Sequence, residues 1–250
     1  MTRRIFIGDI HGHYEGLMRL LEAINPALTD NIFFVGDLID RGPRSRQVVE
    51  YVRKSGHQCV MGNHEQLLLE AFPNGEAHMP AFQGWLYSGG QSTLSSYNNV
   101  DDLFEHLEWI KGLPFYLDLG DIWLVHAGLN PQRTLIEQTS HEYCWIRELF
   151  HSHQTAYFSD KLIITGHTIT FTLPGINPGE IARGPGWLDI DTGAYHPKSG
   201  WLTALDVDNN TVYQYNVFSH MVRMRPTEDA EAPVLQHKIK QRSHHQLVNS

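Results

Sequence analysis

Cysteine and long apolar runs are both scarce in this chain. Among its 250 residues only Cys59 and Cys144 carry thiols, and they do not form a CxxC pair. This spacing indicates neither a disulfide framework nor a thiolate zinc site, so we expect two small, buried side chains. The start, MTRRIFIGD, has only three consecutive apolar residues, far short of a signal-peptide core or a membrane span. We therefore expect a cytoplasmic protein with no membrane partner.

A surplus of basic residues is absent as well. Lys and Arg number 19 against 28 Asp and Glu, which gives a formal net charge of −9. A nucleic-acid backbone or an anionic membrane requires a basic face, so we expect neither as a partner, and any anion must be held by a local site. The length and the 41% hydrophobic content predict one domain, residues 1–225, in a monomer or weak oligomer. The polar, weakly patterned sequence of residues 226–250 predicts a mobile tail.

The first 72 residues alternate short apolar strands with amphipathic helices. The strands are RIFIGD, NIFFVGD and HQCVMGN, and the helices between and after them carry apolar residues on one face. Such alternation predicts right-handed crossovers and a mainly parallel sheet, whose ligand sites lie beyond the carboxyl ends of the strands. The fold class is therefore α/β.

The remaining sequence predicts a less regular arrangement. Residues 73–99 are rich in Gly, Pro, Ser and Asn but contain Phe82, Trp85 and Tyr87, which favours an ordered loop or cap over the site. Helices are expected at 101–113 and 142–150. Further strands are expected at PFYLDL, IWLVHAG, LIITGHT and WLDIDTG, and WLTALDVD and VYQYNVF predict a tight hairpin around Asn209.

Polar side chains follow the strand ends throughout. The corners GDIHG, GDLIDRG and GNHE place oxygen and nitrogen donors where a parallel sheet gathers its ligands, and two later strands end in histidine. Asp9 and His11 are two residues apart, so an extended chain would direct both to one side. Three oxygen and three nitrogen donors without sulfur favour a pair of divalent Mn, Fe or Zn ions, with Asp37 as the bridging carboxylate. The candidate metal ligands are Asp9, His11, Asp37, Asn63, His126 and His167.

A pocket with two divalent ions and only two carboxylates is positive and attracts a phosphate dianion. Arg41 and Arg147 are candidate phosphate-binding residues, because a guanidinium binds phosphate oxygens with paired donors, and Asn63 is a third. His64 follows Asn63 directly and is the candidate general acid for the leaving alkoxide, with Asp40 orienting its ring. The predicted mechanism is direct attack of a metal-bridging hydroxide on phosphorus, without a phosphoenzyme.

These motifs, with HAG at His126 and GHT at His167, resemble the phosphoprotein phosphatase family of metallophosphoesterases. The likeness runs through most of the chain and is strongest to the lambda-type bacterial and phage serine/threonine protein phosphatases. It implies a four-layer αββα sandwich of the calcineurin-like metallophosphoesterase type, manganese in vitro with iron or zinc possible, and phosphoserine or phosphothreonine substrates. It assigns Asp9, His11 and Asp37 to one ion, Asp37, Asn63, His126 and His167 to the other, Asp40 with His64 to the acid pair, and Arg41 with Arg147 to the phosphate clamp.

Two other functions remain as alternatives. The related symmetrical diadenosine tetraphosphate hydrolases show GNHD where this chain has Glu65, and lack an aspartate at the position of Asp40, so we expect a protein phosphatase. A hydrolase of dinucleoside polyphosphates or cyclic nucleotides is the first alternative, and a non-catalytic metal-binding relative is the second. Each site residue also has a structural interpretation, such as a helix cap for Asn63 or a surface ion pair for Arg147. The occurrence of all these site residues in one chain favours the metal site over these structural interpretations.

Overall fold

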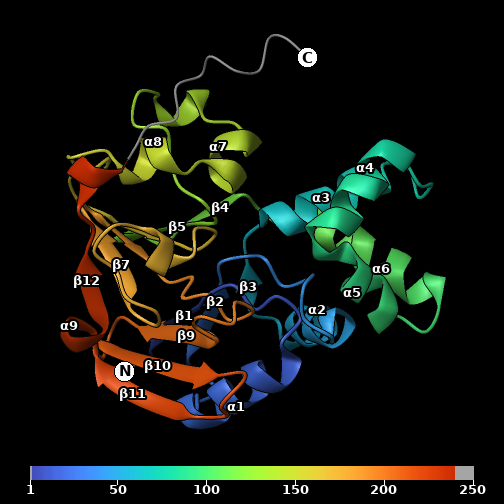
Figure 1. Ribbon diagram of the computed structural model, residues 1–250, viewed down its shortest axis with the longest axis horizontal. Coiled ribbons are helices and arrows are strands. Elements are labelled where there is room, and N and C mark those ends of the chain that lie inside the picture. The colour runs from blue at the N-terminus through green and yellow to red at the C-terminus, as the bar shows by residue number, and fades with distance from the viewer. Residues whose placement is uncertain (1, 240–250) are drawn as a thin grey trace.

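The structure is a computed structural model that describes residues 2–239. Two six-stranded sheets pack against each other (Figure 1). The first has the order β11-β10-β9-β1-β2-β3 and the second β12-β7-β8-β6-β5-β4. No helix in residues 2–239 has the length and apolar character needed to cross a membrane.

The first sheet contains the predicted parallel strands. β1 (Arg4–Ile7), β2 (Asn31–Phe34) and β3 (Gln58–Cys59) are parallel and are connected by α1 (Tyr14–Ile24) and α2 (Ser45–Ser55). The sheet continues on the other side of β1 with antiparallel β9 (Trp201–Asp206), β10 (Thr211–Asn216) and β11 (Val222–Pro226). The β9–β10 hairpin confirms the turn predicted around Asn209.

The second sheet is mixed and is covered by short helices. Its strands are β4 (Tyr116–Asp118), β5 (Ile122–Val125), β6 (Leu162–Thr165), β7 (Ile181–Gly184), β8 (Trp187–Asp189) and β12 (Glu231–Pro233). β5, β6 and β8 are parallel. α7 (Ser140–Trp145) and α8 (Glu148–His151) lie over its outer face, and short 3-10 turns occur at η2 (Leu135–Glu137) and η3 (Thr170–Thr172).

Side-chain alternation along the strands makes four layers. Ile5 and Ile7 belong to the same cluster as the apolar stripe of α1, whereas Phe6 between them points the other way. Phe6 shares its cluster with Leu124 and Ile164 of the second sheet, so a continuous apolar layer fills the space between the sheets. The expected αββα sandwich is therefore confirmed.

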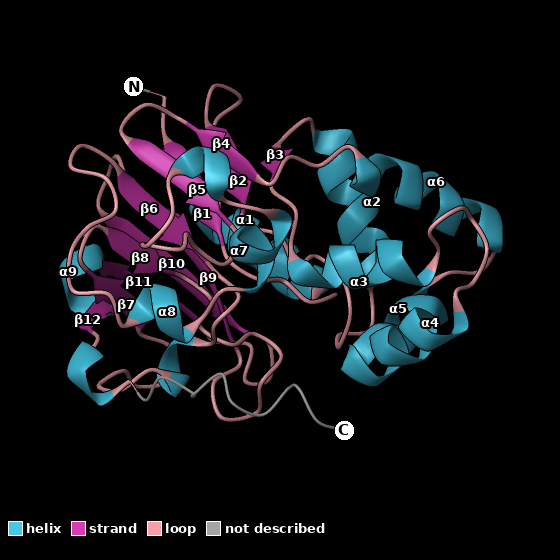
Figure 2. Ribbon diagram, turned by 90° about the horizontal axis from the view of Figure 1, so that it is seen from above, coloured by secondary structure: helices cyan, strands magenta, loops and turns pink. Residues whose placement is uncertain are grey.

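A helical projection extends to one side of the sheets (Figure 2). It contains α3 (Asn63–Ala71), α4 (Met79–Trp85), the π-helical turn η1 (Leu86–Gly90), α5 (Gln91–Ser96) and α6 (Val100–Lys111). Most of residues 73–99, expected as an ordered loop, are thus helical. The cause is aromatic packing, because Phe72 contacts Phe82 and Trp85 at ring-centroid distances of 5.5 and 6.1 Å.

The boundary predicted at residue 225 cuts through the fold. After β11 the chain forms α9 (Thr227–Ala230), β12 and η4 (Gln236–Lys238), and β12 pairs in parallel with β7. Ala230 and Val234 are buried and β12 belongs to the second sheet, so this part of the predicted mobile tail is packed into the fold. Local sequence patterns did not indicate this pairing, because β12 has only three residues and ends in proline. The rest of the predicted tail, 240–250, lies outside the described residues.

Candidate dinuclear metal centre

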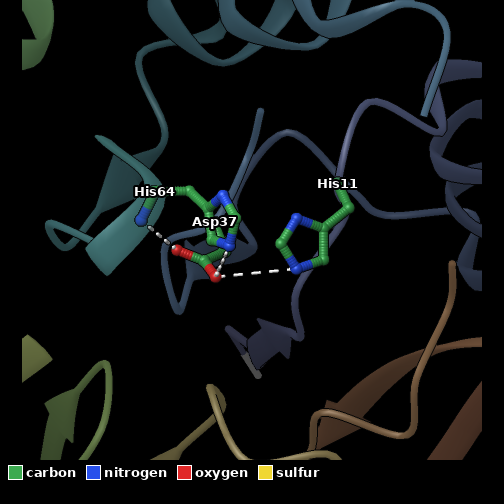
Figure 3. A group of neighbouring side chains, drawn as sticks. All are labelled: His11, Asp37 and His64. Atoms are coloured by element: carbon green, nitrogen blue, oxygen red, sulfur yellow. Dashed lines mark hydrogen bonds and ion pairs between the residues drawn. The ribbon is translucent and has the colours of Figure 1, made fainter. Parts of the chain in front are cut away.

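The carboxylate of Asp37 lies between two groups of histidines. On one side, His11 Nε2 and His64 Nε2 are 3.6 and 3.9 Å from Asp37 Oδ2 (Figure 3). On the other side, His126 Nε2 is 3.4 Å from Asp37 Oδ1, and His167 completes the group. Within each group the potential ligand atoms lie within 4.8 Å of one another, and all these side chains are buried. This geometry suits a carboxylate shared by two cations.

Backbone carbonyls orient two of the imidazoles. His11 Nδ1 lies 2.9 Å from the carbonyl oxygen of Ile39, and His126 Nδ1 lies 2.7 Å from that of Val35. Since a carbonyl only accepts, each Nδ1 carries the proton, and each Nε2 presents a lone pair toward Asp37. Such support of the outer ring nitrogen is typical of metal-binding histidines.

Asn63 begins α3 and faces the second histidine group. Its Oδ1 is 3.0 Å from His126 Nε2 and 2.8 Å from His167 Nδ1. The amide oxygen therefore lies in the same small volume as the two imidazoles and Asp37 Oδ1. The alternative of Asn63 as a helix cap is wrong, because Gly62 occupies the N-cap position of α3.

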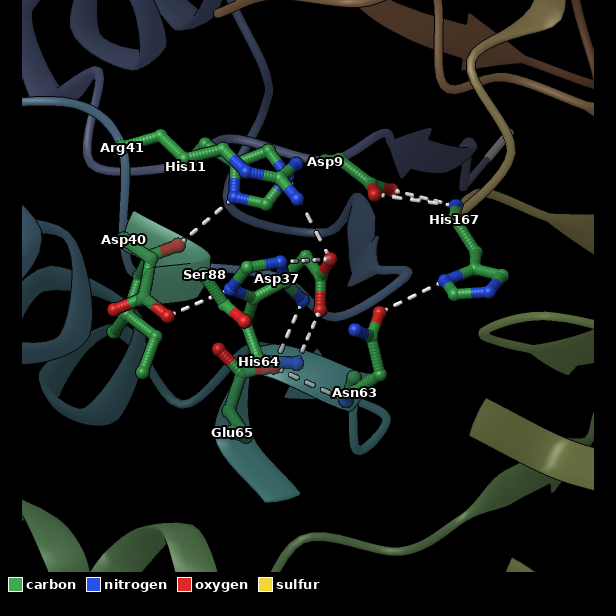
Figure 4. Close-up of polar contacts among 12 residues, drawn as sticks. Asp9, His11, Asp37, Asp40, Arg41, Asn63, His64, Glu65, Ser88 and His167 are labelled. Carbon is green, nitrogen blue, oxygen red and sulfur yellow. Dashed lines mark hydrogen bonds and ion pairs between the residues drawn. The ribbon is translucent and has the colours of Figure 1, made fainter. Parts of the chain in front are cut away.

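Asp9 reaches this pocket differently from the expectation. His11 has a φ of 46°, so the chain is not extended between Asp9 and His11, and the two side chains do not share a face by simple alternation. The Asp9 carboxylate instead accepts the backbone N–H of His167 at 3.1 Å (Figure 4). Gly166 permits this approach, since a Cβ there would lie 2.1 Å from Asp9 Oδ1. Asp9 joins the first sheet to the second at the site.

The charges of the pocket favour cations. Burial lowers the pKa of His11, His126 and His167, which keeps these imidazoles neutral and able to bind metal. Burial opposes ionisation of Asp37, but the surrounding histidines outweigh it and hold its pKa well below the usual value. Burial and the charges of Asp191 and Asp37 raise the pKa of Asp9.

The predicted acid pair is brought together. His64 Nδ1 donates to Asp40 Oδ2 at 2.6 Å, and both side chains are buried. The opposite ring nitrogen, Nε2, faces Asp37 and thus the metal pocket. An imidazole oriented by Asp40 therefore lies at the edge of the metal pocket.

The two arginines approach the pocket from different elements. Arg41 Nη1 lies 2.8 Å from His11 Nε2, and its guanidinium carbon is 4.1 Å from the ring centroid of Tyr195. Arg147 Nη1 donates to the carbonyl of His167 at 3.1 Å and to Thr168 Oγ1 at 3.0 Å. The single helix expected at 142–150 is broken into α7 and α8 at Arg147 (φ −134°, ψ −95°), which lets the side chain turn back toward His167.

Buried acids support the site, although the sequence did not single them out. Glu65 of GNHE accepts the backbone N–H groups of Asp37, Leu38 and Gly62 at 2.8, 2.9 and 3.1 Å. Burial and the charge of Asp37 raise the pKa of Glu65 to about 8. Asp189 and Asp191, in the quoted WLDIDTG stretch, are also buried, and burial raises the pKa of Asp191 to about 6. Asp189 is the last residue of β8 and Asp191 follows it closely, so the end of a strand was the available signal for these two acids.

Curated relatives resemble about half of the chain. Symmetrical bis(5'-nucleosyl)-tetraphosphatase from Dechloromonas aromatica is 39% identical over 132 residues, which cover 51% of this chain and 44% of the relative. The enzyme of the same name from Coxiella burnetii is 36% identical over 139 residues, which cover 54% of this chain and 45% of the relative. The alignments thus span less than half the length of these relatives.

Solved structures resemble nearly the whole fold. A putative diadenosine tetraphosphatase superposes with a TM-score of 0.62 at 19% identity, covering 90% of this chain and 93% of the other. A cold-active protein-tyrosine phosphatase from Shewanella superposes with a TM-score of 0.57 at 17% identity, covering 90% of this chain and 80% of the other. At such identities the likeness shows the fold alone.

A family model matches residues 2–187, three quarters of the chain, and its description is calcineurin-like phosphoesterase. Both groups of potential ligands around Asp37 lie within this region, whereas strands β9 to β12 follow it. The chain belongs to the calcineurin-like phosphoesterase family.

Proposed function

We propose that this protein hydrolyses dinucleoside polyphosphates, such as diadenosine tetraphosphate, with two divalent ions. The position of the Asp37 carboxylate between two histidine groups carries the metal part of the proposal. The names of the curated relatives support the substrate class and favour it over the lambda-type serine/threonine phosphatase expected from the motifs.

The ligands are proposed to divide between two sites. Asp9, His11 and Asp37 would hold one ion, and Asp37, Asn63, His126 and His167 the other. Such ions lower the pKa of water and stabilise charge on phosphoryl oxygens. Neutral imidazoles and carboxylates without sulfur fit manganese, iron or zinc.

The residues around the ligands would bind the phosphate and supply a proton. Arg41 and Arg147 each place a guanidinium beside a proposed histidine ligand, where it can bind phosphate oxygens and neutralise developing charge. His64, oriented by Asp40, would protonate the leaving oxygen. Asn63 would also contact the phosphate.

A phosphomonoesterase acting on phosphoserine or phosphothreonine is the second candidate. The observation that favours it is the 2.6 Å contact of His64 with Asp40. A nucleoside diphosphate leaves as a stabilised anion and needs little help, whereas a serine alkoxide needs a proton as the bond breaks. An oriented acid is therefore of most use on alkyl phosphates.

The two candidates are separated by comparing kcat/KM on diadenosine tetraphosphate and on a phosphoserine peptide, with manganese present. The proposal expects faster cleavage of diadenosine tetraphosphate, with ADP as the product. A preference for the peptide would overturn it and support the second candidate. His126→Ala, which removes a proposed ligand, is the control for a contaminating phosphatase, and both activities should be lost in it.

A further inference from the structure

We propose that Trp85 and Thr93, both from the helical projection, are positioning residues that hold the Asp40 carboxylate in the orientation needed by His64. The proposal deepens the proposed function and rests on the acid role of His64. Neither residue touches the metal pocket. Their effect would pass through Asp40 alone.

Thr93 binds both the side chain and the backbone of Asp40. Its hydroxyl donates to Asp40 Oδ1 at 2.6 Å, and its oxygen accepts the Asp40 backbone N–H at 2.9 Å. Ser45 Oγ lies 3.0 Å from the same N–H. All three residues are fully buried, so water does not replace these contacts.

Trp85 supplies a second donor to the same carboxylate. Its indole Nε1 lies 3.1 Å from Asp40 Oδ1 and 3.0 Å from Oδ2, and the side chain has no exposed surface. The ring is held tightly, since a Cβ on Gly90 would lie 2.3 Å from it. An indole nitrogen only donates, so it needs an acceptor in this buried site, and the two Asp40 carboxylate oxygens provide it.

Together these donors fix the direction in which Asp40 faces. Asp40 Oδ1 accepts a hydrogen bond from the Thr93 hydroxyl, and Oδ2 accepts one from His64 Nδ1. The indole N–H of Trp85 donates to both oxygens. Rotation of the carboxylate would break at least one contact in a buried environment, where an unpaired polar group is costly. The His64 ring is thereby held with Nε2 toward the pocket.

The projection also fixes the backbone at this corner. Asp40 and Arg41 have φ values of 72° and 68°, in the left-handed region that such residues seldom adopt. Thr93 binds the N–H of Asp40, and the carbonyl of Gly89 accepts the N–H of Arg41 at 3.1 Å. The projection is therefore tied to the acid pair through several short contacts and does more than cover the site.

The test compares kcat on an alkyl phosphate and on an aryl phosphate in Thr93→Val, which is nearly isosteric, and in Trp85→Phe, which removes the N–H but replaces the indole with a smaller ring. Loss of orientation should lower kcat on the alkyl ester by about 10- to 100-fold, a part of what a general acid supplies, and on the aryl ester by less than about 3-fold. KM should stay unchanged, and Thr93→Ser should restore the rate because it keeps the hydroxyl. Ser95→Ala is the matched control, since Ser95 is exposed on α5 and its hydroxyl donates to the carbonyl of Gln91 in the same helix.

Combination with Asp40→Asn separates this proposal from the proposed function. If Asp40→Asn lowers kcat equally on the alkyl and the aryl ester, the acid role of His64 fails. In the other unfavourable outcome, Asp40→Asn lowers kcat on the alkyl ester selectively while Thr93→Val and Trp85→Phe leave it unchanged. That result would overturn the positioning role of Thr93 and Trp85 and leave the acid role of His64 intact. In its favour, adding Thr93→Val to Asp40→Asn should cause no further selective loss, because contacting residues that act through one group are not additive. Circular dichroism of each variant checks that it is folded.

Discussion

Glu65 accepts the backbone N–H of Asp37 at 2.8 Å, which links the start of α3 to the end of the second strand. The same carboxylate accepts the N–H of Leu38 and of Gly62. Asp37 has a φ of 50°, and these bonds hold that conformation at the centre of the site. The position of the central carboxylate thus depends on a side chain that is itself fully buried.

Glu65→Ala should therefore weaken both the fold and metal binding. Three buried N–H groups would lose their acceptor, and each unsatisfied group costs about 1–3 kcal/mol. We expect the free energy of unfolding to fall by at least about 3 kcal/mol on this basis, measured by urea titration without metal. Glu70→Ala is the control, because Glu70 is exposed on the same helix. Equal stability of the two variants would contradict this account.

His64→Asn should lower turnover by about 10² to 10⁴ on esters with poor leaving groups, the range that general acids supply. On aryl phosphates and on diadenosine tetraphosphate the loss should be smaller, since their leaving groups need less protonation. Steady-state kinetics on the three substrates measure this difference. The acid role is wrong if the loss is the same for all of them.

Arg147→Lys should raise KM for phosphate substrates more than it lowers kcat. Lysine keeps the charge but loses the planar donors, one of which Arg147 uses to bind the His167 carbonyl and Thr168. A rise of about tenfold corresponds to the loss of one hydrogen bond to a charged group. Arg19→Lys is the control, because Arg19 is exposed and pairs with Glu22 on its own helix. An unchanged KM would remove Arg147 from the phosphate clamp.

Metal removal should make the fold sensitive to alkaline pH. The pKa of Glu65 is raised to about 8 and that of Asp9 is raised as well, so at neutral pH the folded state binds more protons than the unfolded state. The free energy of unfolding should then fall as the pH rises from 6.5 to 8. The lowered pKa of His126 has the opposite effect, but only below its unfolded value of 6.5.

Manganese should reduce the dependence of the free energy of unfolding on pH, because cations offset the charges of the buried carboxylates. Urea titrations at several pH values, in chelator and in manganese, measure both slopes. Chelation should also abolish hydrolysis of an aryl phosphate, and manganese should restore it. Full activity after exhaustive chelation, or a metal-free fold that gains stability toward pH 8, would contradict the prediction.

Truncation after Pro226 should destabilise the domain. It removes β12, which pairs with β7, together with the buried side chains of Ala230 and Val234. Burial of one valine alone contributes about 1.5 kcal/mol or more, so we expect a loss of at least about 2 kcal/mol in the free energy of unfolding. Truncation after Ile239 is the control, because it retains these contacts. Equal melting temperatures for the two truncations would show that β12 contributes nothing.

The sequence by itself determined the sheet-forming pattern and the polar corners. The period of apolar residues predicts β1, β2 and β3 with their crossover helices, and parallel strands necessarily bring their carboxyl ends to one edge. That rule was enough to place His11, Asp37 and Asn63 near one another, whereas His126 and His167 follow β5 and β6 of the second sheet. It works because the strand period and the crossover hand are local properties of the chain.

Only the tertiary structure decided how these corners are held. Asp9 binds the N–H of His167, 158 residues away, and Thr93 reaches Asp40 from 53 residues away. Such contacts depend on how the two sheets and the projection pack together, and short-range periodicity carries no information about that packing. The three-residue strand β12 and the break at Arg147 were likewise hidden, because pairing with β7 and the bonds to His167 and Thr168 fix them more than local propensity does.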